Sequence, residues 1–254
     1  MNRLTIAAFA MTFLAGCSAA APIATPAPTR ESTASPVPTA RPTVVPTASA
    51  APTPTPSPTP SPTGPSLLPA DAALKPGTYF GDIEGMRITL TIPAAGWYSY
   101  SDHCCVIYTE NGDNSGALLF LDGVIDSVYA HACHSEGTEI EFGPTVDDLA
   151  NALRSVKDFE VTGPTEVTLS GFQGKRVGLT VPLDVNVNDP TCDNGEYRLN
   201  EGRHYQRAGQ TDDNWILNVN GQRYVPTFST TTQTPADVLQ QVEQIRDSLV
   251  IEPN

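Results

Sequence analysis

The alternation of apolar and polar residues predicts several half-buried β-strands in the C-terminal three quarters of the chain. In RITLTIP (87–93), Ile88, Leu90 and Ile92 fall on one face with a period of two residues. Similar short segments occur at 117–122, 125–130, 166–170, 175–181 and 214–220. The dipeptide Asn220-Gly221 after the last of them is a strong hairpin signal. We therefore expect a mostly antiparallel sheet.

Two segments show the apolar stripe of an amphipathic helix instead. In PTVDDLANALRSV (144–156), Thr145 and Asp148 fit a capping box, and the stripe consists of Val146, Leu149, Leu153 and Val156. In TPADVLQQVEQIRDSL (234–249), Thr234 is expected as the cap and Pro235 as the first helical residue. Its stripe consists of Val238, Leu239, Val242, Ile245 and Leu249. Because both stripes are narrow, each helix is expected to pack on the sheet in an α+β fold.

The first 17 residues, MNRLTIAAFAMTFLAGC, have the features of a signal peptide. Arg3 precedes an apolar run from Leu4 to Leu14 that is shorter than the roughly 20 residues that a membrane-spanning helix needs. The ending LAGC resembles the bacterial lipobox, in which the cysteine, here Cys17, becomes the lipidated first residue. We expect the acyl chains on Cys17 to insert among membrane lipids and hold the protein at the extracytoplasmic face of the cell membrane. The alternative is an ordinary signal peptide.

Residues 18–66 form a linker that consists almost wholly of Pro, Thr, Ser and Ala. This composition offers almost no large apolar side chain to bury, so the linker is predicted to be disordered or extended. In the polyproline II conformation, about 45 residues would span up to roughly 140 Å. We expect a stalk that carries one globular domain, residues 67–254.

The expected domain is strongly acidic. Leaving Arg3, Arg30, Arg41 and Glu31 out of the 14 basic and 28 acidic residues leaves 11 basic and 27 acidic residues, a net charge of −16. Nucleic acid and anionic lipid headgroups both require a basic surface, so the composition excludes them as partners of this domain.

Histidine and cysteine gather in two short clusters that suggest metal ligands. His103, Cys104 and Cys105 form one cluster, and His131 and His134 flank Cys133 in the other. Neither cluster has the CxxC spacing of a zinc ribbon. Sulfur and imidazole together suit copper best. A copper-binding or redox lipoprotein is therefore the alternative function.

No segment carries a catalytic motif. GxSxG is absent, and DVNVNDPTCDNGE (184–196) departs from a calcium loop because Asp189 and Gly195 occupy the positions of its glycine and its glutamate. The pair Asp147-Asp148 is explained by charge at a helix N-terminus, and Glu139 with Glu141 by the outward face of a strand. We expect a protein that is not an enzyme and holds no cofactor.

Several segments are similar to a group of uncharacterised extracytoplasmic domains, often lipid-anchored, of actinobacteria and similar bacteria. They are GPTVDDLANAL, PTEVTLSGFQGKRVGLTVP, the cysteine in PTCDNGEYRL, WILNVNGQRYV and QIRDSLVIEP, and they span nearly all of the domain. The motif PxxGW at 93–97, the late hairpin and a last helix ending in DSL resemble the PsbP-like α+β fold. The resemblance implies a surface domain in which Cys133 and Cys192 match cysteines of those relatives. The doublet Cys104-Cys105 departs from them.

The four cysteines of the domain are even in number and allow three disulfide pairings. Disulfides persist outside the cytoplasm. We favour Cys133 with Cys192, which leaves Cys104 and Cys105 bonded to each other, free, or crossed with the other two. The function expected from the anchor, the stalk and the domain is display of a non-catalytic binding or interaction domain. Its ligand would be an envelope component, an extracellular molecule or a partner protein.

Overall fold

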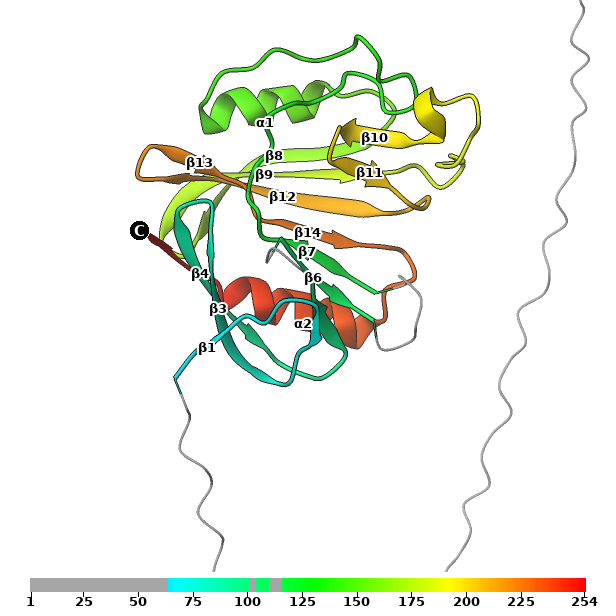
Figure 1. The fold of residues 1–254 in the computed structure, drawn as a ribbon. Coiled ribbons are helices and arrows are strands. Elements are labelled where there is room, and N and C mark those ends of the chain that lie inside the picture. The colour runs from blue at the N-terminus through cyan, green and yellow to red at the C-terminus, as the bar shows by residue number, and fades with distance from the viewer. Residues whose placement is uncertain (1–63, 101–103, 110–115) are drawn as a thin grey trace, which may run out of the picture. The chain divides into compact units, whose positions relative to one another are not determined.

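The computed structural model describes residues 64–100, 104–109 and 116–254, which form an α+β unit (Figure 1). Cys17, His103 and nearly all of the expected linker lie outside the described residues. The strands before the first helix are β1 (Ser66–Leu67), β2 (Ala72–Ala73), β3 (Gly77–Ile83), β4 (Met86–Ile92), β5 (Trp97–Ser99), β6 (Cys105–Tyr108) and β7 (Leu118–Phe120). The remaining elements are α1 (Val146–Ser155), β8 (Glu160–Leu169), β9 (Phe172–Thr180), β10 (Tyr197–Asn200), β11 (Arg203–Tyr205), β12 (Thr211–Val219), β13 (Gln222–Tyr224), β14 (Thr227–Thr230), α2 (Ala236–Asp247) and β15 (Val250–Pro253).

The strands form one large sheet and two small ones. The large sheet has nine strands in the order β2-β5-β6-β7-β14-β12-β9-β8, with β13 also paired to β12. A second sheet has the order β1-β3-β4-β15, and β10 and β11 pair only with each other. All pairings are antiparallel except that of β1 with β3. The predicted hairpin at Asn220-Gly221 is confirmed, because Val219 pairs with Gln222.

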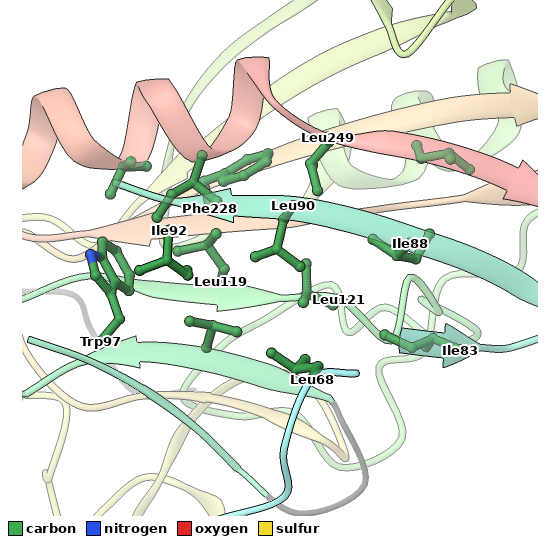
Figure 2. Packing of buried hydrophobic residues seen from close by; sticks show 14 of the residues in the cluster. Leu68, Ile83, Ile88, Leu90, Ile92, Trp97, Leu119, Leu121, Phe228 and Leu249 are labelled. Atoms are coloured by element: carbon green, nitrogen blue, oxygen red, sulfur yellow. The ribbon is translucent and has the colours of Figure 1, made fainter. Parts of the chain in front are cut away.

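The large sheet has a hydrophobic core on each of its two faces. On one face Val106, Leu119 and Phe228 pack with β3, β4 and α2. Figure 2 shows Ile92, Leu119 and Phe228 within this core. On the opposite face, Leu179 and Ile216 pack with α1 and with the β10–β11 hairpin. The first core lies mainly over β5, β6 and β7, and the second mainly over β12 and β9.

Helix α1 begins as predicted. The hydroxyl of Thr145 accepts a hydrogen bond from the backbone N–H of Asp148 at 3.1 Å, and the carboxylate of Asp148 accepts one from the N–H of Thr145 at 3.1 Å. Leu149, Leu153 and Val156 are buried, while Val146 is partly exposed. The capping box and the buried stripe are therefore confirmed.

The expected start of α2 is wrong by one residue. Pro235 is the N-cap, and the hydroxyl of Thr234 instead donates to the carbonyl oxygen of Gly116 at 2.7 Å. It also accepts from the N–H of Thr231 at 2.8 Å. Four stripe residues are buried, but Leu239 is 40% exposed.

The expected strand at 125–130 is also wrong. Only Tyr129 makes a ladder pair there, an isolated bridge with Glu139. The N–H of Tyr129 instead bonds the carbonyl oxygen of Leu199 at 2.8 Å, and the guanidinium of Arg223 bonds the carbonyl oxygen of Ile125 at 3.1 Å. Because these bonds do not continue as the repeated pairs of a ladder, the segment is an irregular loop. Glu139 and Glu141 are exposed in irregular chain rather than on a strand.

Candidate binding groove beside Arg203

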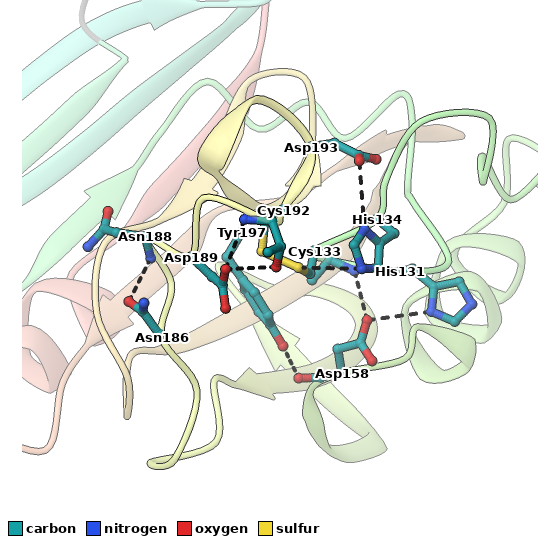
Figure 3. The surroundings of a disulfide bond; sticks show 12 residues. His131, Cys133, His134, Asp158, Asn186, Asn188, Asp189, Cys192, Asp193 and Tyr197 are labelled. Carbon is teal, nitrogen blue, oxygen red and sulfur yellow. Dashed lines mark hydrogen bonds and ion pairs between the residues drawn. A yellow bond between two sulfur atoms is a disulfide. The ribbon is translucent and has the colours of Figure 1, made fainter.

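The disulfide between Cys133 and Cys192 is confirmed, with 4.5 Å between the two Cα atoms (Figure 3). It ties the loop that contains the two histidines to the loop that precedes β10. Backbone hydrogen bonds reinforce this junction, because Asp193 N–H donates to the carbonyl oxygen of Cys133 and Arg198 N–H to that of Ala132, both at 2.8 Å. The bridge therefore fixes one end of the core under α1.

The histidines of the same loop point at different carboxylates. Nδ1 of His131 lies 3.5 Å from Asp158, and Nδ1 of His134 lies 3.7 Å from Asp193 (Figure 3). Their side chains are 49% and 69% exposed, so both imidazoles are largely hydrated.

The candidate metal ligands do not gather into one centre in the described structure. Cys104 and Cys105 are bonded to each other, so all four described cysteines are in disulfides and provide no thiolate. Among the residues with described positions, no group of three or more His, Cys, Asp or Glu side chains could hold a metal ion. In the loop that resembles a calcium site, Asp189 instead accepts hydrogen bonds from the N–H and hydroxyl of Thr191. The N–H of Thr191 is the first cause of the lowered pKa of Asp189.

Strand register brings together a different set of residues, which sequence reasoning missed. Cys105 pairs with Phe120 and Ile107 with Leu118, so these four side chains share one sheet face. On the next strand, β14, Thr227 and Ser229 continue the same two rows. We call these six residues the floor. They lie on the face that carries α1 farther along the sheet, over β8, β9 and β12.

Two adjoining cavities open over the floor. Both are lined by Cys105, Phe120, Gly202 and Arg203, and together we call them the groove. The first, with a volume of about 340 Å³, is lined also by Ile107, Leu118, Arg207 and His204. The second, with a volume of about 680 Å³, is lined by the acidic residues Asp122, Asp126, Glu139 and Glu201. We call them the basic cavity and the acidic cavity.

Arg203 stands between the two cavities and is held by a buried carboxylate. Its Nε donates to Asp212 Oδ2 at 2.8 Å, and the exposed fractions of the two side chains are 11% and 0%. The guanidinium lies over the ring of Phe120 in the floor, with Cζ 3.2 Å from the ring centroid. Such a cation–π contact and a buried charge-assisted bond both fix the side chain in one place.

The Arg203–Asp212 pair has unused hydrogen-bonding capacity. Arg203 Nη2, Asp212 Oδ1 and the Tyr205 hydroxyl are buried and have no hydrogen-bond partner in the described part of the chain. Burial raises the pKa of Tyr205 well above its usual value, and the carboxylate of Asp212 raises it further. Tyr205 is therefore neutral beside the buried pair. Removing Arg203 would leave the buried carboxylate of Asp212 without its ion-pair partner.

Burial also affects Asp122 in the acidic cavity. Desolvation raises the pKa of this carboxyl, while the Gly123 N–H and Arg203 partly oppose the shift. Because the folded-state pKa lies above the unfolded one, ionisation of Asp122 lowers stability as the pH rises through the folded-state value. Holding this carboxyl in the cavity therefore costs stability once it ionises.

The polar groups of the groove are arranged as a fixed hydrogen-bonding surface. Gln210 donates from Nε2 to the Ser229 hydroxyl at 3.2 Å and accepts from the Gln206 N–H at 3.1 Å. An apolar floor with a few positioned polar groups is the usual composition of a small-molecule site. The segment TDDNWIL was the part of the sequence that could have indicated this groove. In it, Asp212 and Asn214 occupy the same strand face as the buried Ile216.

No helix within the described ranges is long and apolar enough to cross a membrane. Comparison with protein-family descriptions, curated proteins and solved structures found no match to this chain.

Proposed function

We propose that this protein is a lipid-anchored, extracytoplasmic binding protein whose groove holds a small organic molecule. The observation that carries the proposal is the Arg203–Asp212 pair fixed over an apolar floor. A buried ion pair contributes little net stability compared with an apolar pair of the same size, so its position beside a cavity favours a role in recognition. Both cavity volumes fall in the range of about 300–1,000 Å³ that is common for small-molecule sites.

The binding role is tested by filling the groove. Gly202 lines both cavities, and among the described atoms a Cβ added there would meet only the Asn200 side-chain oxygen, 3.7 Å away. Gly202→Trp should therefore fold and place an indole over the floor. We expect fragments that bind the full chain in ligand-observed NMR to bind Gly202→Trp at least about tenfold more weakly, a loss of about 1.4 kcal/mol.

The matched control is Gly64→Trp, which adds the same side chain where no heavy atom of the described residues lies within 4 Å of the new Cβ. This variant should bind the fragments as the parent does. The binding proposal is wrong if no fragment binds, or if every fragment that binds does so equally well to Gly202→Trp.

The anchor is supported by the LAGC sequence at the end of the apolar run. Replacing Cys17 by serine should remove the acylated residue, so that the chain no longer holds acyl chains for membrane insertion. In detergent phase separation, the parent should enter the detergent phase. Cys17→Ser should instead remain as an uncleaved precursor or be released into the medium. A correctly processed Cys17→Ser chain that still enters the detergent phase would contradict lipidation.

A further inference from the structure

The charges around the groove are distributed unequally. The domain as a whole is strongly acidic, yet Arg203, His204 and Arg207 line the basic cavity, and none of its described lining residues carries a carboxylate. The acidic cavity on the other side of Arg203 has four carboxylates in its lining. The groove therefore has a basic part and an acidic part, and Arg203 lines both.

Arg207 supplies the available positive charge of the basic cavity. The charge of Arg203 is opposed by Asp212, whereas the side chain of Arg207 forms no ion pair with any residue that the structure describes. Arg207 is partly exposed and lines the same cavity as Gln210. An arginine that has no ion pair among the described residues and lines a cavity favours one bidentate anion, and carboxylate matches its planar fork.

The remaining surface of the basic cavity suits an apolar body. Ile107, Leu118 and Phe120 form its base, and Cys105 contributes disulfide sulfur rather than a thiol. A ligand with several negative charges would meet one arginine that forms no ion pair with a described residue, and it would be repelled by the carboxylates of the neighbouring cavity. The lining thus selects for a single negative charge.

We propose that the basic cavity binds a small organic monoanion. In this arrangement its carboxylate pairs with Arg207, and its apolar body lies on Ile107, Leu118 and Phe120. The inference rests on the proposed binding function and names the chemical class of the ligand.

The test uses three probes that share one body and differ in charge: phenylbutyrate, phenylbutanol and phenylbutylamine. Each is titrated into the full chain carrying Cys17→Ser and followed by two-dimensional amide NMR. We expect phenylbutyrate to bind tightest and to shift the amide signals of Ile107 and Leu118. Arg207→Gln should weaken phenylbutyrate about tenfold and phenylbutanol by less than about twofold, because only the first uses the charge-assisted bond.

Arg154→Gln is the matched control, since it removes the same charge from an exposed position in the last turn of α1. It should leave the affinity for all three probes unchanged. The ligand class is overturned if phenylbutanol or phenylbutylamine binds as tightly as phenylbutyrate, if Arg207→Gln has no effect, or if no probe binds. A fragment that Gly202→Trp excludes would still support the groove as a binding site after any of these results. Absence of every such fragment would overturn the proposed function itself.

Discussion

Replacing Arg203 by alanine is expected to lower the free energy of unfolding by about 3–5 kcal/mol, because it leaves a charged carboxylate buried without its partner. Asp212 is 0% exposed, and the Nε–Oδ2 hydrogen bond of 2.8 Å is its contact with a cation. The change also removes the guanidinium that covers Phe120. Urea unfolding of protein with intact disulfides measures the difference.

Arg176→Ala is the matched control for this prediction. Arg176 Nε lies 2.5 Å from Asp213 Oδ1, but its side chain is 51% exposed, so water replaces most of the lost interaction. Its loss should lower the free energy of unfolding by no more than about 1 kcal/mol. The double variant Arg203→Met with Asp212→Leu should regain most of the stability lost by Arg203→Ala, because it leaves no buried charge. An Arg203→Ala protein within about 1 kcal/mol of the parent would contradict the buried pair.

Removing the disulfide between Cys133 and Cys192 is expected to have a similarly large effect. The two residues are separated by 59 positions, and closing a loop of that length restricts the unfolded chain by about 4 kcal/mol in the chain-entropy description. The double variant Cys133→Ser with Cys192→Ser should therefore lose about 2–5 kcal/mol of unfolding free energy, measured by urea unfolding.

Three control variants test whether the loss of stability is specific to the bridge between Cys133 and Cys192. Cys104→Ser with Cys105→Ser should lose less stability, because adjacent residues close almost no loop. His131→Ala and His134→Ala should each stay within about 0.5 kcal/mol of the parent, since both imidazoles are largely exposed. Chelator should leave the melting temperature unchanged. Free thiols at Cys133 and Cys192, found by peptide mapping of the non-reduced protein, would refute the bridge.

Features that depend on neighbouring residues were predictable from the sequence. The alternation at Ile88, Leu90 and Ile92 predicted β4 because one face of that strand is buried. Thr145 and Asp148 predicted the start of α1 because a capping box needs only four consecutive residues. Thr234 failed as a cap because its hydroxyl bonds the carbonyl oxygen of Gly116, which is 118 residues away. A local pattern cannot report such a partner.

The groove could not be predicted because it depends on how distant strands pair. Its floor comes from three strands, and Arg203 reaches Asp212 only because the β10–β11 hairpin packs against the large sheet. The segment TDDNWIL did signal part of this arrangement. Asp212 and Asn214 are buried and alternate with the partly exposed Asp213, which indicates polar residues on a buried face. The partners of those residues are set by tertiary structure.

The central claim, that the groove is a binding site, is tested most directly by amide NMR mapping of the full chain with the tightest fragment from the screen. We predict that the largest shifts fall on the floor residues Cys105, Ile107, Leu118 and Phe120 and on Arg203. Shifts confined to residues outside the groove, with these five signals unchanged at saturation, would contradict the claim.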